Sequence, residues 1–230
     1  MNEQQYRHEL KYVVSAAQIP LLKTRIEKIM KFDPHVGTNG LYNIRSLYFD
    51  DYLNRCLYEN ENGTDPREKF RIRIYNHSPL RINLECKRKE RSKTQKKSCI
   101  ITREQFDALD NSFPATDKNP LLNKVLLQMR TQLLRPVIIV EYDRIPYIYQ
   151  NGNVRVTFDM NISSSSSLHN FLDDEIPRRP IMPTGQHIME IKYDEFLPDF
   201  IYRALNLGDL RQTAYSKYYL CRKYALKEGK

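Results

Sequence analysis

The chain of 230 residues carries 37 Lys and Arg against 28 Asp and Glu, which gives a formal net charge of +9 at pH 7. Hydrophobic residues make up 40% of it and only seven residues are glycine, which excludes an extensively disordered chain and allows a sizeable core. No apolar run approaches the ~20 residues of a membrane-spanning helix, and the polar start is unlike a signal peptide, so we expect a soluble, cytoplasmic protein.

The excess of positive charge predicts a polyanionic partner, such as nucleic acid, an anionic membrane or a phosphorylated small molecule. Net charge alone does not indicate which of these partners binds. A basic surface that is solvated and binds no partner is the simpler alternative. The four cysteines form no C-x-x-C pair and have no zinc-finger spacing to a histidine. We therefore expect reduced thiols rather than a zinc site.

Elements predicted from periodicity and capping follow one another without an internal repeat or a composition break. Before residue 65 they are, in chain order, a strand at 5–14, a helix at 16–32, a strand at 42–49 and a short helix at 52–59. Three strands follow within 67–101, then a helix after Thr102 and a longer helix from Pro120 to before Pro136. The last third contains strands at 137–149, 154–159 and 188–193, an irregular segment at 161–186, and helices at 197–207 and 215–226. Capping boxes are predicted at the first and third helices, from Ser15 with Gln18 and from Thr102 with Gln105.

The three strands within 67–101 place charge on one face. Arg71 and Arg73 alternate with apolar residues, which is the period-two pattern of a half-buried strand. Glu85 and Lys87 share a face of the second strand, and Lys96 lies on one face of the third. A face dominated in this way by Lys and Arg repels itself unless an anion binds to it.

A charged face alternates with an apolar face in six of the predicted strands. An open sheet with one wet face explains one or two such strands, whereas six indicate that the charged faces meet inside a closed barrel. We therefore predict an α+β fold: a single domain over residues 1–230, built as an antiparallel eight-stranded β-barrel with helices packed outside. Its lumen would hold ten cations and three carboxylates, namely Arg7, Glu9, Lys11, Arg71, Arg73, Glu85, Lys87, Lys96, Arg144, Arg155, Glu190, Lys192 and Lys217.

Ten cations in an enclosed space require counter-charge, because an unpaired buried charge is strongly disfavoured. Arginine suits phosphate, since its planar guanidinium donates two hydrogen bonds at once. The few carboxylates suit Mg²⁺ or Mn²⁺, which take one or two carboxylates together with phosphate oxygens. These are the parts that phosphoryl transfer needs, and the lack of a Walker A loop excludes a P-loop enzyme.

Eight short motifs carry a family resemblance, in the right order and over nearly the whole chain. They are R-x-E-x-K-Y at 7–12, S-L-Y-F-D at 46–50, F-R-I-R at 70–73, L-E-C-K at 84–87, Y-D-R at 142–144, V-R-V-T-F-D at 154–159, M-E-I-K at 189–192 and Y-S-K-Y at 215–218. With these motifs the chain resembles the VTC domain, the catalytic domain of the vacuolar transporter chaperone polyphosphate polymerases. That domain lies within the triphosphate tunnel metalloenzyme (CYTH-like) superfamily.

The resemblance implies a β-tunnel whose basic walls and metal ion hold a nucleoside triphosphate or polyphosphate. The residues predicted to act on the transferred phosphoryl group are Lys11, Arg71, Arg73, Lys87, Arg144 and Arg155. Further phosphate contacts are predicted from Lys96, Lys192, Lys217 and Arg7. Glu190 is the implied metal ligand, with Glu9 and Glu85 as additional ligands for Mn²⁺ or Mg²⁺.

The first motif departs from the wider superfamily, whose pattern opens E-x-E-x-K. Arg7 stands where the first Glu would be, which removes one metal ligand. This change disfavours the two-metal hydrolysis of the triphosphatase branch and favours the polymerase branch.

The predicted function is therefore transfer of the γ-phosphoryl group of ATP to a growing polyphosphate chain. Two alternatives stay open: a tunnel triphosphatase acting on inorganic or organic triphosphate, and a non-catalytic module that binds polyphosphate or inositol phosphates. Product translocation would need a separate membrane protein as partner. Nucleic acid is the least favoured partner, because aromatic residues do not line up with the basic face as stacking platforms.

Overall fold

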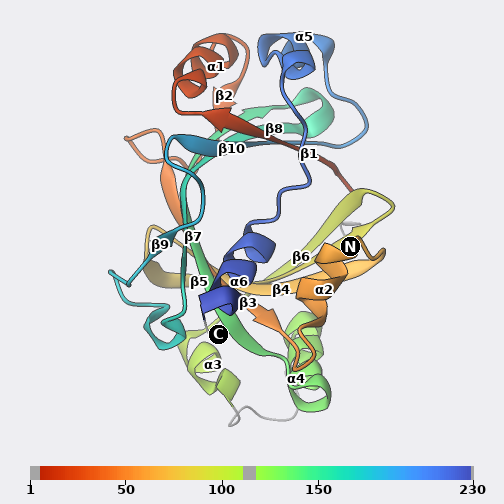
Figure 1. Ribbon diagram of the computed structural model, residues 1–230, viewed down its shortest axis with the longest axis vertical. Helices are drawn as coiled ribbons and strands as arrows, with labels where there is room; N and C mark the ends of the chain where they lie inside the picture. Colours follow the sequence, from red (N-terminus) through yellow and green to blue (C-terminus); the bar gives the residue numbers. More distant parts are fainter. Residues whose placement is uncertain (1–5, 111–117, 229–230) are drawn as a thin grey trace.

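The computed structural model describes residues 6–110 and 118–228, and in them the chain builds one ten-stranded antiparallel sheet with helices on both of its faces (Figure 1). The eight main strands are β1 (His8–Ser15), β3 (Tyr42–Asp50), β4 (Arg67–Tyr75), β5 (Ser78–Glu90), β6 (Lys93–Ile101), β7 (Arg135–Tyr149), β8 (Val154–Ser165) and β10 (Gln186–Tyr193). Two short strands, β2 (Lys31–Phe32) and β9 (Arg179–Pro180), pair with β7 and β8.

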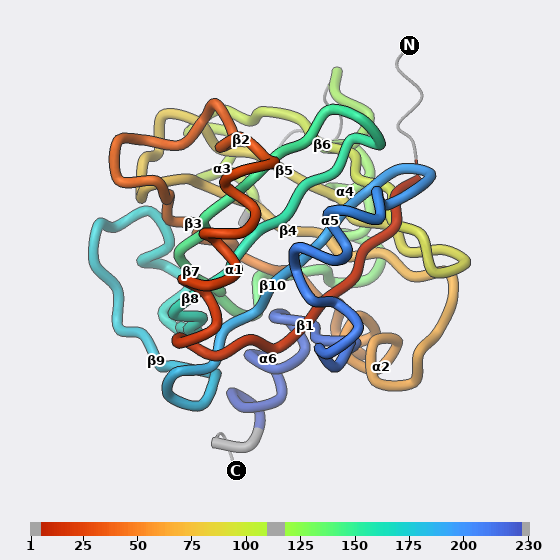
Figure 2. Tube along the Cα trace, turned by 90° about the horizontal axis from the view of Figure 1, so that it is seen from above, coloured from red at the N-terminus to blue at the C-terminus, as the bar shows by residue number. Residues whose placement is uncertain are grey.

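The main strands are ordered β1-β10-β8-β7-β3-β4-β5-β6, and the sheet curls so that its two outer strands meet (Figure 2). The contact is a single antiparallel bridge, in which Arg7 and Thr94 exchange backbone hydrogen bonds of 2.9 Å. The result is a half-barrel with a concave and a convex face, closed at that point. The α+β class and the eight-stranded antiparallel tunnel fold are thus confirmed.

Helices cover the convex face at its two ends, where the apolar side of each strand needs a partner. At one end lie α1 (Gln18–Ile26) and α5 (Asp199–Ala204), and at the other α3 (Arg103–Asp107) and α4 (Pro120–Gln132). Ile19 and Leu22 of α1 pack over β8 and β10, and Val125 of α4 packs over β4 and β5. This burial fixes which face of each strand is left for the concave side.

The helix α6 (Lys217–Glu228) differs from these helices because it lies in the concave side of the sheet (Figure 1). Its Tyr218 and Cys221 are buried against Ile138, Val140 and other apolar residues of the concave face. Close by, α2 (Arg55–Glu61) packs against β4 and α6. One part of the concave face is therefore filled by an apolar core, and the charged residues occupy the rest.

Local signals predicted several boundaries correctly. Ser15 and Gln18 exchange the two hydrogen bonds of a capping box, of 2.8 and 3.2 Å. Thr102 and Gln105 form the second predicted capping box. At the β7–β8 turn Gly152 has φ +73°, and a Cβ there would lie 2.8 Å from the carbonyl oxygen of Phe196, so this position requires glycine.

Several boundaries were wrong. The helix predicted to reach residue 32 ends at Ile26, and Lys31–Phe32 form the short strand β2. The strand predicted at 154–159 continues to Ser165, because the serines at 163–165 pair with β7 on one side and β9 on the other. Serine has little strand propensity, so pairing overrides the local pattern. The helix predicted from residue 52 begins at Arg55, because the Asp51 carboxylate accepts the N–H groups of Leu53 and Arg55 and Asn54 has φ +53°.

Candidate functional site

Alternation along the strands brings charged side chains from distant parts of the sequence onto the concave face. The antiparallel register sets Lys11 opposite Glu190 and Arg71 opposite Glu85. Because side chains of directly opposed residues lie on the same face at ~5 Å, these charges meet in one cluster.

The first group of contacts is centred on Asp159 of β8, which has no exposed surface. Both of its carboxylate oxygens accept hydrogen bonds from Arg144, at 2.6 and 2.7 Å, and one also lies 2.6 Å from Lys217 Nζ. The Arg144 guanidinium and the Lys217 ammonium also stack on the ring of Tyr142, at 5.3 and 4.9 Å from its centroid. Strand β7 and the first residue of α6 are thus joined through a single carboxylate.

Glu190 of β10 forms the second group. Its carboxylate lies 2.8 Å from Lys192 Nζ and 3.9 Å from the ammonium groups of both Lys11 and Lys217. Lys11 also lies 2.9 Å from Glu9, whose other oxygen lies 2.6 Å from Lys87 of β5. Glu9 therefore bridges β1 to β5 across the opening between the outer strands.

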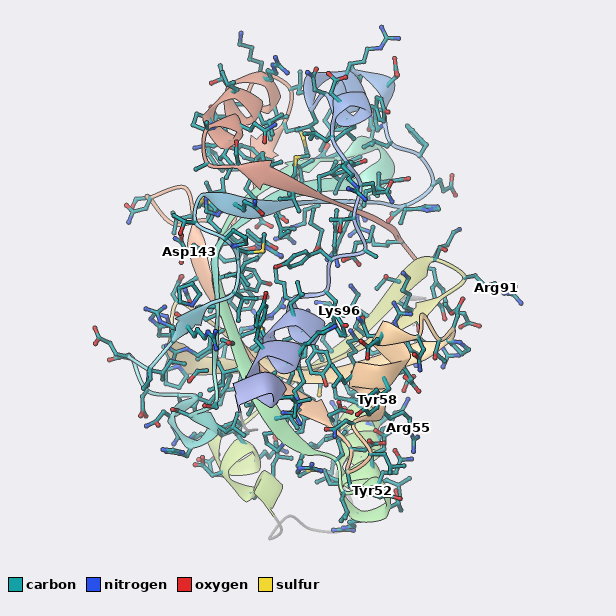
Figure 3. The ribbon with its side chains drawn as sticks, in the orientation of Figure 1. Tyr52, Arg55, Tyr58, Arg91, Lys96 and Asp143 are labelled. Atoms are coloured by element: carbon teal, nitrogen blue, oxygen red, sulfur yellow. The ribbon has the colours of Figure 1, made fainter. Side chains whose placement is uncertain are left out.

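Glu85 of β5 forms the third group, with three cations around one buried carboxylate. Arg71 lies at 2.7 Å, Lys96 at 3.2 Å and Arg73 at 3.8 Å. The Arg71 guanidinium also donates to the Tyr48 hydroxyl at 2.9 Å. Lys96 lies on the side of β6 that faces α6 (Figure 3).

The carboxylates of this cluster are outnumbered by its cations. Four carboxylates, those of Glu9, Glu85, Asp159 and Glu190, serve eight cations: Lys11, Arg71, Arg73, Lys87, Lys96, Arg144, Lys192 and Lys217. Desolvated cations need strong acceptors. The cluster is therefore a site with surplus positive charge that an anion is suited to neutralise.

Shifted pKa values agree with a surplus of cations. Burial by itself would raise the pKa of Glu190, but the charges of Lys192 and Lys11 hold this pKa well below its usual range. The carboxylate of Glu85 is likewise kept ionised against burial by Arg73 and Arg71. The lysines differ from one another. The neighbouring carboxylates outweigh burial and raise the pKa of Lys11 and of Lys217, whereas burial lowers the pKa of Lys87 to about 7 despite the attraction of Glu9. All carboxylates thus stay charged at neutral pH while Lys87 is close to losing its proton.

Two predicted site residues lie apart from the shared carboxylates. Arg155 contacts Asp33 at 2.8 Å and the Tyr42 hydroxyl at 2.7 Å, at the end of the concave face near β2. Arg7 pairs with Asp194 at 2.7 Å, beyond the end of β10. The other predicted residues all belong to the cluster.

Some residues of the site were not identified from the sequence. Asp159 ends the V-R-V-T-F-D motif but was not among the predicted ligands, although the same period-two pattern that places Arg155 on the concave face also places Asp159 there. Tyr142 received no role, although burial raises its pKa and Arg144 and Arg73 together bring it below its usual value. Thr157, opposite Glu190, has a buried hydroxyl without a hydrogen-bond partner in the described part of the chain.

The predicted metal ligands fit a divalent ion only in combination with substrate. Within residues 6–110 and 118–228 no group of three or more His, Cys, Asp or Glu side chains is arranged to hold a metal. Glu190 and Glu9 are close enough to interact electrostatically, and the free Thr157 hydroxyl lies opposite Glu190. One or two carboxylates of this kind bind Mg²⁺ or Mn²⁺ when phosphate oxygens and water complete the coordination.

A comparison with known protein families shows to which family the chain belongs. The model of the VTC domain matches residues 6–226. The chain belongs to the VTC domain family. This family is part of the triphosphate tunnel metalloenzyme superfamily, whose members bind triphosphate substrates and generally use divalent metal ions.

Solved structures of this superfamily share the fold of the VTC domain described here. One is a candidate adenylyl cyclase from Hippeastrum reported to have a dominant triphosphatase activity, with 12% identity, coverage of 96% of both chains and a TM-score of 0.54. Another is a candidate adenylate cyclase from Vibrio parahaemolyticus, with 10% identity, coverage of 95% of this chain and 98% of that chain, and a TM-score of 0.52. A comparison with curated proteins found no match. Among the helices of the described residues, none has the length and apolar character to cross a membrane.

Proposed function

We propose that this VTC domain is a metal-dependent phosphotransferase that transfers the γ-phosphoryl group of ATP to the end of a polyphosphate chain. The observation that carries the proposal is the sharing of four carboxylates among eight cations on the concave face. Phosphoryl transfer depends mainly on stabilising negative charge spread over the phosphoryl oxygens. An excess of fixed cations on the partly desolvated concave face supplies that stabilisation.

In this proposal each of the three groups of contacts, centred on Glu85, Asp159 and Glu190, has a role. Arg71 and Arg73, which share Glu85, would donate to phosphate oxygens, and Arg144 would do so from the opposite wall while Asp159 holds it in position. Glu190, with Glu9 beside it, would hold the metal ion, which neutralises charge on the β- and γ-phosphates when bound. The bond between the γ-phosphorus and its bridging oxygen breaks, ADP leaves, and a terminal oxygen of the chain forms the new bond.

The position of Arg7 supports a polymerase over a two-metal hydrolase. Its guanidinium pairs with Asp194 outside the cluster, so this position provides no carboxylate for a second metal ion.

The second candidate function is hydrolysis of triphosphate. It is favoured by the exposure of the Lys96 side chain, 51%, which leaves the Glu85 group of contacts open to water as an acceptor. A membrane protein partner for product transfer stays a prediction.

One assay separates the alternatives. Purified protein is incubated with ATP and Mn²⁺ or Mg²⁺, long-chain product is read on a gel, and free phosphate is measured in the same samples. Chain growth supports the polymerase, and phosphate release without chains supports the triphosphatase. Tight binding of polyphosphate with neither reaction would leave a non-catalytic binding module and contradict the proposal.

A further inference from the structure

A histidine and a buried carboxylate lie together at the end of the concave face, next to Arg155. They belong to a turn over residues 33–36, which a backbone hydrogen bond of 3.0 Å closes between its first and last residues. Asp33 at the first position and Pro34 at the second are the residues that such a turn favours. The Asp33 N–H donates to the carbonyl oxygen of Pro146 in β7 at 3.2 Å, so the turn is fixed to the sheet.

The turn orients the imidazole of His35. The Oδ1 atom of Asp33 accepts the His35 backbone N–H at 2.9 Å and lies 2.8 Å from the ring nitrogen Nδ1. Burial by itself would raise the pKa of Asp33, but the hydrogen bonds from His35 and the charge of Arg155 hold this pKa below its usual value. An ionised carboxylate can only accept hydrogen bonds, so Nδ1 carries the proton and, in the neutral ring, Nε2 keeps its lone pair.

The second ring nitrogen of His35 is open to a reactant. The side chain is 84% exposed, although the Asp33 carboxylate that holds it is buried. In the described part of the chain Nε2 makes no hydrogen bond or ion pair. The result is an oriented imidazole with one nitrogen occupied and the other free.

The other oxygen of Asp33 connects this imidazole to one of the predicted phosphate ligands. Oδ2 lies 2.8 Å from Nη2 of Arg155, and the same Nη2 donates to the Tyr42 hydroxyl at 2.7 Å. The Nε atom of Arg155 is buried but has no hydrogen-bond partner among the described residues. A buried donor without an acceptor is costly, and a phosphate oxygen is a strong acceptor for a guanidinium. One carboxylate therefore joins the free imidazole nitrogen to a position suited to phosphate.

An oriented histidine of this kind can act as a base or as a nucleophile. A general base removes a proton from the attacking group. The end of a polyphosphate chain does not need one, because a terminal phosphate loses its second proton with a pKa of about 6. An imidazole whose Nδ1–H is held by a carboxylate is suited to nucleophilic attack through Nε2. The chemistry of the substrate thus favours the second role.

We propose that His35 is a phosphorylation site, which accepts the γ-phosphoryl group of ATP on Nε2. The inference rests on the proposed function, because it takes ATP as the phosphoryl donor. The Nε2 lone pair forms a P–N bond while the bond between the γ-phosphorus and its bridging oxygen breaks, and ADP leaves with that electron pair. The imidazolium keeps its proton on Nδ1, where the Asp33 carboxylate balances the positive charge. Arg155 stabilises the transferred group by donating through Nε.

Labelled ATP tests the site. Purified protein is incubated with ATP labelled at the γ-phosphate and with Mg²⁺ or Mn²⁺, and the label on the denatured protein is measured after treatment with acid and with alkali. A P–N bond to histidine is broken by acid and survives alkali, whereas a phosphate ester of serine behaves in the opposite way. We expect acid-labile label, and mass spectrometry at neutral pH should place the phosphate on His35.

Three variants make the measurement specific. His35→Asn keeps an amide N–H for Asp33 but has no reactive nitrogen, so the acid-labile label should be lost completely. Asp33→Asn keeps the shape of the side chain without its charge, and labelling should be at least about 10-fold slower. His169→Gln is the matched control, because His169 is also exposed and makes no hydrogen bond or ion pair in the part of the chain that the structure describes. Its labelling should equal that of the unmodified protein.

The outcomes decide the two proposals separately. An unmodified protein without acid-labile label in the presence of either metal would overturn the phosphorylation site. Undiminished label in His35→Asn, or an equal loss in His169→Gln, would overturn it as well. If polyphosphate chains grow while the protein stays unlabelled, the polymerase proposal stands and this inference fails. If His35 is labelled but no chains form, the site stands and the polymerase proposal fails.

Discussion

Buried arginine–carboxylate contacts occur on both faces of the sheet, and they differ in how completely the arginine is satisfied. On the convex face Arg45 is 1% exposed, donates to Glu141 at 2.6 Å and also donates to the carbonyl oxygens of Phe171, Asp173 and Asp174. On the concave face two arginines and a lysine share the single carboxylate of Glu85.

The difference separates a structural contact from the proposed phosphate site. The guanidinium of Arg45 already has one charged and three neutral acceptors, so a ligand adds nothing to it. The guanidinium of Arg73 is buried, but its contacts are a carboxylate at 3.8 Å and hydroxyl groups at 3.2 and 3.5 Å. Residue type and burial are alike at the two places. The number and strength of the acceptors decide which arginine is available to phosphate.

The largest expected effect is a loss of activity when an arginine of the concave face is removed. Replacing Arg71 or Arg73 by Ala should lower the rate of phosphoryl transfer about 10³-fold, because a fixed donor to the transferred group is lost. The folded structure should persist, which circular dichroism and thermal unfolding will check. Turnover equal to that of the unmodified protein in both variants would contradict the site assignment.

The convex pair should respond in the opposite way. Arg45→Ala leaves the Glu141 carboxylate with Asn43, the half-buried His77 and the exposed Arg178, and should lower the free energy of unfolding by about 3–5 kcal/mol. Activity per folded molecule should stay the same. Denaturant unfolding measures the loss, and a variant as stable as the parent would show that the pair does not hold the loop at 171–174 in place.

An intermediate effect is expected from pH. Because burial lowers the pKa of Lys87 to about 7, this predicted phosphate ligand loses its remaining charge in the free protein as pH rises from 7 to 9. Polyphosphate requires the charged form, so its affinity should fall by about 10-fold over this range. Calorimetric titrations at constant ionic strength test this, and an affinity that does not change between pH 7 and 9 would contradict it.

The smallest effect concerns the stability of the protein without ligand. A lysine whose pKa is lower in the folded than in the unfolded state disfavours folding, in full below about pH 8 and no longer above the unfolded value of 10.5. Lys69→Met keeps the aliphatic stem over Tyr218 and should raise the free energy of unfolding by about 1 kcal/mol at pH 7, after allowance for solvent screening.

Thermal unfolding of the two proteins at pH 7 provides the measurement. A Lys69→Met protein less stable than the parent at pH 7 would show that the hydrogen bonds from Lys69 to Asn60 and Ser216 outweigh the cost of burying its charge.

The sequence by itself determined which residues share a face and where two helices begin. Alternation put Lys11, Arg71 and Glu190 on the charged side of their strands, because successive side chains of a strand point to opposite faces. Capping is equally local, and both predicted capping boxes are present. Such features depend on a few neighbouring residues and need no knowledge of the strand order.

Only the tertiary structure decided which charges meet. The strand order brings β10 between β1 and β8, so Glu190 faces Lys11 on one side and Thr157 on the other, and α6 delivers Lys217 to Asp159 from the end of the chain. It also directed Arg7 and Arg155 to other carboxylates and left Lys69 without one. Coulomb energies depend on distances through space, and pairing between remote strands sets those distances.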